Sequence, residues 1–461
     1  MPEGRTLDPT ILREYDIRGV VGDSFSAEDV RVIGRAFGSL LVEAGGTSVA
    51  VGYDGRLSSP ELEVALVDGL VACGLQVYRA GRGPSPMLYY ATYELEADAG
   101  LMITGSHNPP EYNGIKMTLQ GKAFFGDDIQ SLGARAAAGN FVSGTGQAEE
   151  KFVFDDYVAR VRQDYQGSKS LKIAWDPANG AAGEAVSRLV SDLPGEHFLI
   201  NAEIDGTFPA HHPDPTVEKN LEQLKALVAE NGCDLGIGFD GDGDRVGVID
   251  GSGRVLWGDQ LLVILARDVL ADHPGAPIIA DVKASQVFFD EIRRLGGEPV
   301  LWKAGHSHIK SKMVELNSPL AGEMSAHIFF KHRYYGYDDA LYAAIRLISI
   351  IASGPESLSD IYDSLPKMVN TPELRFDCAE DRKFRVIEEV RDRLASDPQV
   401  QVNDIDGVRV STDDGWWLLR ASNTQAVLVA RCESGDQAGL ERLKSALVNQ
   451  LRQSDISPPN F

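Results

Sequence analysis

The sequence Thr104-Gly105-Ser106-His107-Asn108-Pro109-Pro110 lies where an apolar segment, residues 100–104, ends. That segment has the length and composition of a buried strand. Gly105 frees the backbone at the end of the strand, and the Asn-Pro-Pro sequence turns the chain outward because proline continues neither a helix nor a central strand. We therefore expect Ser106 on a stiff loop at the carboxyl end of a strand, where open α/β sheets bind their ligands.

A serine displayed in this way could attack a carbonyl or carry a phosphoryl group. The esterase elbow requires a glycine two residues before the serine, and Thr104 occupies that position. His107 follows Ser106 directly, and sequence neighbours rarely form a serine–base pair. A plain turn with a capping serine is the alternative interpretation, so the choice depends on motifs further along the chain.

Three aspartates alternate with glycines in Asp240-Gly241-Asp242-Gly243-Asp244-Arg245, directly after the apolar segment 235–239. Carboxylates this close repel one another unless a cation binds them, and the glycines let the loop fold tightly around it. A calcium EF-hand would require glycine and glutamate at the positions of Arg245 and Gly251, so that interpretation fails. A solvated acidic turn is the alternative, but the flanking apolar strands favour a metal site, and oxygen ligands favour Mg²⁺.

The composition is that of a soluble globular protein of 461 residues, a length that suggests about three or four domains. The net charge of −24 argues against nucleic acid or an anionic membrane as a general partner, although an anionic substrate could bind in a local basic cleft. The four cysteines lack any metal-binding spacing, so buried reduced thiols are expected. No apolar signal region or membrane-spanning segment is recognisable, so the expected compartment is the cytoplasm.

Three successive segments follow one plan: a strand that ends near an aspartate, a helix, and a later strand that leads into a polar loop. We predict three similar α/β units, in which the order of structural elements is repeated but the amino-acid sequence is not. The opening residues 14–19 are expected to form a loop, and residues 26–43 a helix. The first strands of the three units are predicted at 48–52, 171–176 and 277–281.

The last segment differs from the other three. Predicted strands at 416–419 and 426–431 flank the sequence Arg420-Ala421-Ser422-Asn423-Thr424-Gln425, and predicted helices at 385–395 and 437–451 complete an α+β unit. The flanked loop is rich in hydrogen-bond donors, which suits a phosphate group, although alone it could equally be a surface turn. Residues 367–375 are expected to form an extended connector.

Two further groups of polar residues could complete a binding site. Glu323, Ser325 and His327 offer acceptors and donors at alternate positions, as sugar hydroxyls require. The positive charge of a basic cleft could come from Lys116, Arg245, Lys283 and His306. Taken singly, each of these residues is more typical of an ordinary surface.

Together the motifs resemble the α-D-phosphohexomutase superfamily, most closely its bacterial phosphomannomutase/phosphoglucomutase branch. The resemblance covers nearly the whole chain and runs in order through residues 15–19, 104–109, 240–245, 322–327 and 420–424. It implies a four-domain, heart-shaped α/β enzyme with three similar α/β domains and a C-terminal α+β domain around a central cleft. We expect these domains at 1–150 with the phosphoserine loop, 151–256 with the metal-binding loop, 257–367 with the sugar-binding loop and 368–461 with the phosphate-binding loop.

The resemblance also implies a role for each motif. Ser106 would carry the phosphoryl group, and Ser106, Asp240, Asp242 and Asp244 would hold one Mg²⁺ per subunit. The implied catalytic residues are Ser106, Lys116, Arg245, His306 and His327. The implied substrate-binding residues are Tyr15, Arg18, Lys283, Glu323, Ser325, His327, Arg420, Ser422, Asn423 and Thr424.

The implied activity is the interconversion of hexose 1-phosphates and hexose 6-phosphates, with mannose and glucose as the hexoses. The reaction would pass through a phosphoserine enzyme and a hexose 1,6-bisphosphate, which also acts as activator. One alternative is phosphoglucosamine mutase, in which glutamine commonly replaces Met324; another is a phosphoserine-dependent sugar phosphatase. A silent binding protein would require neither Ser106 nor three aspartates. The expected partners are small-molecule sugar phosphates, with no nucleic acid and no membrane, for a monomer or small homo-oligomer. Ala326 and Gln425 depart from residues common in the family.

Overall fold

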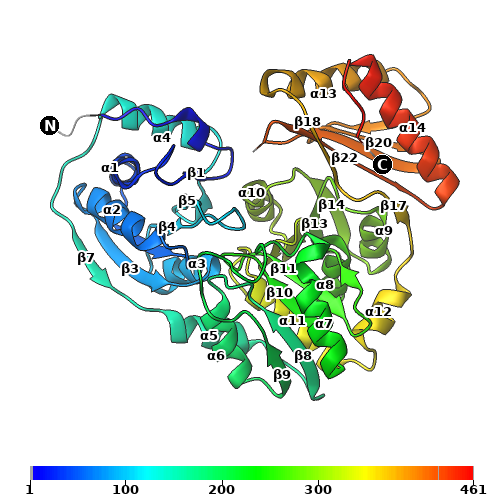
Figure 1. The fold of residues 1–461 in the computed structure, drawn as a ribbon, viewed down its shortest axis with the longest axis horizontal. Helices are drawn as coiled ribbons and strands as arrows, with labels where there is room; N and C mark the ends of the chain where they lie inside the picture. The colour runs from blue at the N-terminus through cyan, green and yellow to red at the C-terminus, as the bar shows by residue number, and fades with distance from the viewer. Residues whose placement is uncertain (1–3, 424, 460–461) are drawn as a thin grey trace.

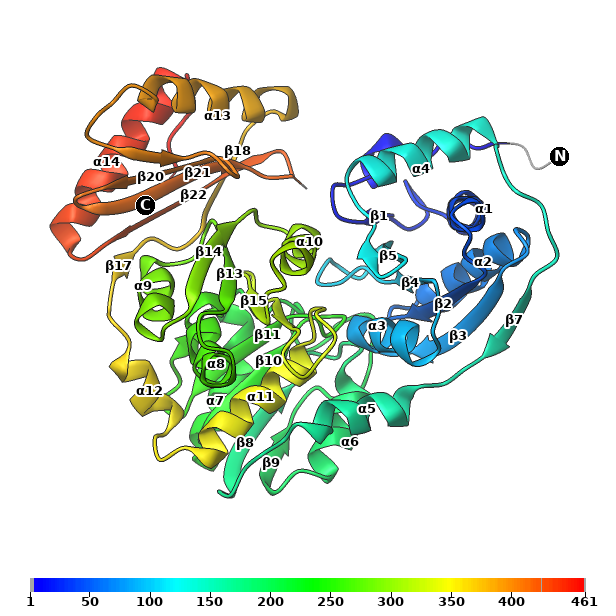
Figure 2. The same cartoon turned by 180° about the vertical axis from the view of Figure 1, so that it is seen from behind.

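The computed structural model describes residues 4–423 and 425–459, and this part of the chain forms four successive sheets, each associated with helices (Figures 1 and 2). Among the described residues the sheets contain seven, five, four and six strands, in chain order. The first three are mixed sheets, whereas the fourth is antiparallel throughout. In Figure 1 the first unit (blue to cyan) and the fourth (orange to red) lie on either side of the second and third.

The first three sheets share one strand order, as the predicted repeat requires. In each unit the first strand pairs in parallel with the second and third strands, and the third pairs antiparallel with the fourth. These strands are β2 (Ser48–Tyr53), β3 (Gln76–Arg82), β4 (Ala99–Ile103) and β5 (Tyr112–Leu119); β8 (Leu171–Asp176), β9 (Gly195–Leu199), β10 (Leu235–Phe239) and β11 (Val246–Asp250); and β13 (Pro277–Asp281), β14 (Glu298–Trp302), β15 (Leu320–Gly322) and β16 (Ile328–Phe330).

The repeat extends to the turn after each first strand. There an aspartate side chain accepts a hydrogen bond from the backbone N–H two residues later, over 2.9 to 3.0 Å. This local bond favours a turn over a continued strand and so ends each strand at the same place. The aspartates are Asp54, Asp176 and Asp281.

Four shorter strands complete the first two sheets. The sequence predicts a loop over residues 14–19, but residues 17–19 lie in β1 (Ile17–Val20), which pairs antiparallel with β5. The buried side chain of Ile17 explains the difference, because its partner Ile115 is too distant in sequence for the pairing to be recognised locally. The other three strands are β6 (Lys122–Ala123), β7 (Gln147–Glu150) and β12 (Val255–Leu256).

Several helices begin where the sequence indicates a cap or a proline. The first, α1 (Ala27–Glu43), starts after a capping box formed by Ser26 and Asp29, and α2 (Ser59–Val71) has proline in its first turn. The remaining helices of the first three units are α3 (Ser85–Glu94), α4 (Asp127–Ala138), α5 (Phe154–Gln163), α6 (Gly183–Ser191), α7 (Glu222–Asn231), α8 (Gly258–Asp272), α9 (Gln286–Arg294), α10 (His306–Leu316), α11 (Ala340–Ser353) and α12 (Leu358–Ser364), with 3₁₀ turns at Pro9–Ile11 and Glu218–Leu221.

The fourth sheet lies between its own helices and the third unit. Along β21 (Gly415–Ala421), Trp417 and Leu419 belong to the core beneath the helices, whereas Trp416 and Leu418 pack with Val282 of the third unit. This alternation is that of a strand buried on both faces. The other elements are β17 (Val369–Asn370), β18 (Leu374–Asp377), β19 (Gln401–Asn403), β20 (Val408–Thr412), β22 (Val427–Ser434), α13 (Glu380–Leu394) and α14 (Gln437–Gln453).

The apolar cores define a central body with two attached lobes. One continuous core runs through the second and third units and takes in α3 of the first, whereas most of the first unit and the helix-covered face of the fourth have cores of their own. The second and third units therefore form the fixed part against which the other two are placed. Among the described residues, no helix is long and apolar enough to span a bilayer.

Candidate active site

One cleft of about 970 Å³ is lined by residues of all four units. The loops after β4, β10, β15 and β21 reach it, in keeping with ligand binding at the carboxyl ends of strands in α/β sheets. Thr424 lies outside the described residues, and the three aspartates lie beneath the cleft surface. The predicted residues that line the cleft are Tyr15, Arg18, Ser106, Lys116, Arg245, Lys283, His306, Glu323, Ser325, His327, Arg420, Ser422 and Asn423.

Ser106 is held in a backbone conformation that few residues other than glycine adopt. Its φ angle is 51°, in the left-handed region, which costs a non-glycine residue about 1–3 kcal/mol. The backbone N–H donates to Thr104 Oγ1 over 2.8 Å, and Ser106 Oγ lies 3.2 Å from Asp240 Oδ2 and 3.2 Å from His107 Nδ1. The strained turn thus directs the serine hydroxyl at the aspartate loop of the next unit.

The guanidinium of Arg56, which no sequence motif assigns to the site, holds this loop from behind. Arg56 is 1% exposed, and its Nε donates to Asp54 Oδ2 over 3.2 Å. Gly105 permits the approach, because a Cβ at that position would lie 2.5 Å from Arg56 Cζ and Nε. Hydrogen bonds of 2.6 to 2.9 Å join the guanidinium to four carbonyl oxygens of the loop, those of Ser106, Asn108, Pro109 and Tyr112.

Asp240, Asp242 and Asp244 form a compact and fully buried carboxylate group. One oxygen of each lies within 4.8 Å of the others. Burial, together with the two neighbouring carboxylates, raises the pKa of Asp240 well above its ordinary value. Within residues 4–423 and 425–459, Oδ1 of Asp242 and Oδ1 of Asp244 have no hydrogen-bond partner. These carboxylate oxygens could serve as the ligands of a bound metal ion.

Lys116 on β5 joins the first unit to this carboxylate group. Its Nζ donates to Asp242 Oδ2 over 2.6 Å and also to Asp244 Oδ2. Burial alone would lower the pKa of Lys116, but these two carboxylates raise it well above its usual range. The lysine is therefore a cation at neutral pH, and it offsets part of the buried negative charge.

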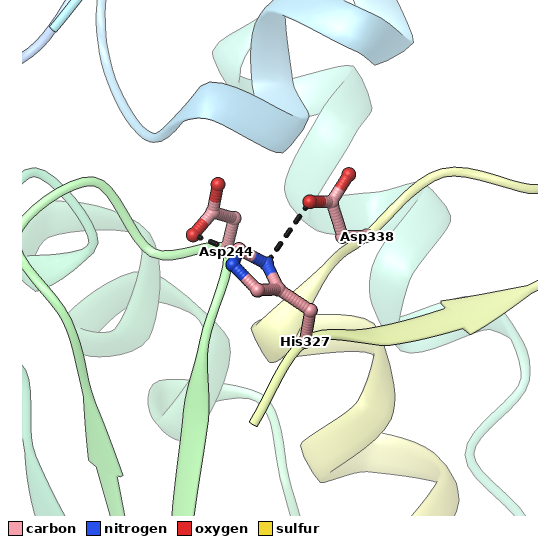
Figure 3. A group of neighbouring side chains, drawn as sticks. All are labelled: Asp244, His327 and Asp338. Carbon is pink, nitrogen blue, oxygen red and sulfur yellow. Dashed lines mark ion pairs between the residues drawn. The ribbon is translucent and has the colours of Figure 1, made fainter. Parts of the chain in front are cut away.

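His327 lies between carboxylates of the second and third units (Figure 3). Its Nδ1 is 3.0 Å from Asp338 Oδ2 and 3.6 Å from Asp244 Oδ1, and its Nε2 accepts a hydrogen bond of 3.0 Å from Arg245 Nε. Because Nε2 acts as acceptor, the proton of a neutral imidazole is on Nδ1, facing Asp338. Asp338 is a member of the site that the sequence motifs miss.

The cluster of Asp244, His327 and Asp338 has the spacing of metal ligands, but the surrounding cations already balance its charge. Lys310 Nζ donates to Asp338 Oδ1 over 3.1 Å. Burial would raise the pKa of Asp338, but Lys310 and His327 lower it well below its ordinary value. The geometry is therefore that of a carboxylate that orients a histidine. Close to it, burial holds the pKa of His306 well below its usual range, so that imidazole is neutral.

Glu323, directly after β15, has one carboxylate oxygen with a hydrogen-bond partner and one without a partner among the described residues. Its Oε1 accepts a 2.7 Å hydrogen bond from the N–H of Gly305, and its Oε2 is buried with no partner among the described residues. Gly305 has φ 123°, and a Cβ there would lie 2.5 Å from the ring of Tyr15. Lys283, also on the cleft, pairs with Glu373 Oε2 at 3.2 Å. The unpaired carboxylate oxygen of Glu323 suits a ligand group that donates a hydrogen bond, and the cation of Lys283 suits an anionic group.

In the fourth unit, donors at the end of β21 and in the loop after it are bound by groups of other segments. Arg420 Nη2 lies 3.1 Å from Asp406 Oδ2, which also accepts a 2.9 Å hydrogen bond from the N–H of Ala304. Asn423 Nδ2 donates to the hydroxyl of Tyr15 over 2.8 Å, and that hydroxyl donates to the carbonyl of Ala304 over 3.0 Å. Tyr15 therefore connects the first, third and fourth units across the cleft.

Comparisons with known proteins match each of the four units. Family models match the described order of units: "Phosphoglucomutase/phosphomannomutase, alpha/beta/alpha domain I" over residues 9–142, domain II over 154–253, domain III over 257–369, and the "C-terminal domain" over 373–450. The chain is 44% identical over 454 residues to a Pseudomonas aeruginosa protein named phosphomannomutase/phosphoglucomutase, and 40% identical over 454 residues to a Neisseria meningitidis phosphoglucomutase, with 98% of each chain covered in both cases. A crystal structure of a phosphoglucomutase/phosphomannomutase family protein from Burkholderia thailandensis superposes with a TM-score of 0.93, at 41% identity over 99% of this chain and 100% of that one.

Proposed function

The chain belongs to the phosphoglucomutase/phosphomannomutase family, and from that premise we propose that it is a phosphohexomutase that interconverts the 1- and 6-phosphates of glucose and mannose. One observation carries the proposal: the strained Ser106 lies against a buried carboxylate group in the same cleft that receives the donor-rich loop of the fourth unit. A mutase needs both features, because it handles a sugar with a phosphate at each end. We retain 1–150, 151–256, 257–367 and 368–461 as its four domains.

The reaction divides into two balanced phosphoryl transfers. In the first, a sugar hydroxyl attacks the phosphorus of phospho-Ser106, the bond from phosphorus to Ser106 Oγ breaks, and the hydroxyl proton passes to a base. The hexose 1,6-bisphosphate then turns round. In the second, Ser106 Oγ attacks the other phosphate, the bond from phosphorus to the sugar oxygen breaks, and that oxygen receives a proton. Such transfers depend mainly on positioning and on neutralising charge on the phosphoryl oxygens.

The geometry distributes charge and proton transfer among different residues. Lys116 stays protonated between two aspartates, so we assign it charge neutralisation together with Arg18 and Arg245. We favour His327 as the proton-transfer group, because Asp338 Oδ2 lies 3.0 Å from its Nδ1 and would stabilise an imidazolium. Neutral His306 is the alternative base.

The residues present fit a magnesium ion. Two buried Asp oxygens, Oδ1 of Asp242 and of Asp244, have no partner among the described residues. They lie beside Asp240, whose Oδ2 is 3.2 Å from Ser106 Oγ. We propose that Asp240, Asp242, Asp244 and Ser106 hold one Mg²⁺ per subunit. When bound, the ion would polarise the phosphoryl oxygens at Ser106.

We assign the two ends of the sugar to the third and fourth units. Glu323 and Ser325 would exchange hydrogen bonds with two sugar hydroxyls, and Glu323 Oε2 has no partner for this role among the residues that the structure describes. The non-reacting phosphate would be bound by Arg420, Ser422, Asn423 and Thr424, with Lys283, Tyr15 and Arg18 contributing along the cleft. Binding would require Arg420 and Asn423 to leave Asp406 and Tyr15.

A coupled assay with glucose 1-phosphate, mannose 1-phosphate and glucosamine 1-phosphate tests the proposal directly. Each sugar phosphate is supplied with Mg²⁺ and a catalytic amount of hexose 1,6-bisphosphate. We expect the bisphosphate to act as activator by regenerating phospho-Ser106. Ser106→Ala should lose most turnover while melting as the wild type does. Ser170→Ala, which changes an exposed serine, is the matched control. Turnover near the wild-type level in Ser106→Ala would refute the mechanism, and release of free phosphate instead of hexose 6-phosphate would favour a phosphatase.

A further inference from the structure

Lys383 is a buried lysine to which the proposed mechanism gives no role. It lies in the first turn of α13, is 1% exposed, and sits behind the residues that line the cleft in the described part of the chain. The start of a helix carries partial positive charge, so a cation is unfavourable there. Local helix chemistry therefore does not explain why a lysine occupies this position.

The ammonium of Lys383 reaches the loop between β21 and β22. Nζ donates to the carbonyl oxygens of Ser422, over 2.6 Å, and of Gln425, over 3.1 Å. Glu380, on the same helix, places a carboxylate oxygen 2.6 Å from Nζ. The three protons of the ammonium thus have three acceptors, which accounts for a lysine at this depth.

These two carbonyls fix the orientation of the loop. In a planar trans peptide the N–H of the next residue points opposite to the carbonyl. The Ser422 carbonyl faces Lys383, so the N–H of Asn423 points away from it. Ser422 and Asn423 both line the cleft, and Asn423 Nδ2 already reaches across to Tyr15. The lysine therefore binds the carbonyl side of the loop, and the N–H of Asn423 points to the other side.

We infer that Lys383 is a positioning residue of the phosphate-binding loop: by holding the carbonyls of Ser422 and Gln425, it presents the donors of that loop to the non-reacting phosphate of the sugar. The inference rests on the proposed function, and it extends it to a residue that touches no substrate. Because the non-reacting phosphate is bound in both the ground state and the transition state, a misplaced loop weakens both equally. KM then rises while kcat is retained.

The test compares Lys383→Met, Lys383→Arg and Lys367→Met with the wild type. In Lys383→Met we expect the KM for glucose 1-phosphate to rise about tenfold, the scale of one lost hydrogen bond to a charged group, with kcat within about threefold. Lys383→Arg keeps the donors and should return KM to within about threefold of wild type. Lys367→Met removes a 71% exposed lysine that pairs with Asp363, and should leave both constants unchanged.

Calorimetric binding of glucose 6-phosphate to the same proteins gives a readout that does not depend on turnover. Its Kd should rise about tenfold in Lys383→Met and recover in Lys383→Arg. An unchanged Kd and KM in Lys383→Met, or a fall in kcat at constant KM, would overturn the inference. If Lys383→Met does not fold, Lys383→Gln replaces it, and wild-type binding there overturns the inference equally. A wild-type protein that binds the sugar phosphate but does not turn it over contradicts the proposed function alone.

Discussion

Replacing Arg56 by methionine would show how far the reactive serine depends on a residue behind its loop. Methionine occupies much of the same space but donates no hydrogen bond. The carboxylate of Asp54 would lose its guanidinium partner, and the carbonyl of Ser106 would lose a 2.7 Å hydrogen bond. Nothing else among the described side chains donates to that carbonyl in this structure, so the left-handed turn at Ser106 would lose a main support.

The size of the effect follows from the burial of the pair. Removing one partner of a buried ion pair costs about 3–5 kcal/mol. Relaxation of the turn at Ser106 would return part of the roughly 1–3 kcal/mol stored there. We therefore expect a net loss of about 3 kcal/mol, which lowers the unfolding midpoint of a domain this size by roughly 10 °C. A serine oxygen displaced by about 1 Å would lower kcat about a hundredfold.

Differential scanning calorimetry and the coupled mutase assay measure the two effects on the same preparation. Arg135→Met is the matched control in the first unit, because Arg135 makes a bidentate pair with Glu43 at the surface, where a pair contributes at most about 1 kcal/mol. Arg56→Lys keeps the charge but has fewer donors, and should fall between wild type and Arg56→Met. Wild-type stability and turnover in Arg56→Met would refute the role assigned to this arginine.

Four further outcomes are expected. Tyr15→Phe removes the hydroxyl that joins Ala304 and Asn423. Without substrate, small-angle scattering should then show a more open protein, in which the fourth unit pivots near Thr371-Pro372. A wild-type scattering profile would contradict this expectation. Chelation should abolish turnover and Mg²⁺ restore it, whereas Ca²⁺ should bind but support little turnover because its coordination is looser; full activity in chelator would exclude a metal requirement. Burial would raise the pKa of Glu373, but Lys283 lowers it from the ordinary value of 4.5 to about 2. The ion pair of Glu373 with Lys283 therefore stabilises the fold fully above pH 4.5, and this stabilisation is lost as the pH falls towards 2. The melting midpoint should fall over that range in the wild type, and less in Glu373→Gln. Glucose 1-phosphate and mannose 1-phosphate should react with kcat/KM values within about a hundredfold, and glucosamine 1-phosphate more slowly, because no residue assigned here contacts the C2 substituent; a preference of thousands-fold for one epimer would reveal such a contact.

The site residues that were named from the sequence, in the cleft and directly beneath it, could be predicted because most belong to a local pattern. The aspartates of Asp240-Gly241-Asp242-Gly243-Asp244 follow an apolar strand directly, and Glu323 follows β15 in the same way. A strand end next to polar residues is recognisable within a few positions. The repeat of three similar α/β units could also be predicted, because a parallel strand requires a crossover and crossover helices are recognisable from their periodicity.

Asp338 could not be predicted because its role depends on partners from other elements. It lies between a run of tyrosines and the start of α11, where an acidic residue resembles a helix cap, and Asp339 is in fact that cap. The contacts that assign Asp338 to the site come from His327 and from Lys310 on α10. β1 escaped prediction for the same reason, since its pairing with β5 joins residues about a hundred positions apart.

Arg56 and Lys383 escape prediction for a different physical reason, which is the kind of group they bind. Both donate to backbone carbonyls, 50 and 39 residues away in sequence at Ser106 and Ser422. Every residue has a carbonyl, so the loop's own sequence does not reveal which cation holds it. A residue that touches a ligand is constrained by the chemistry of that ligand and appears in a motif. A residue behind a loop is constrained only by where the carbonyls lie in the folded chain. In both loops the cation takes up the carbonyls on the side away from the cleft, and the side facing the cleft is left with donors and a hydroxyl. Two loops of different sequence, in different sheets, thus share one arrangement: a buried cation binds their carbonyls and turns them away from the cleft. If both loops bind phosphate as we propose, this arrangement lets the anion meet donors rather than carbonyls.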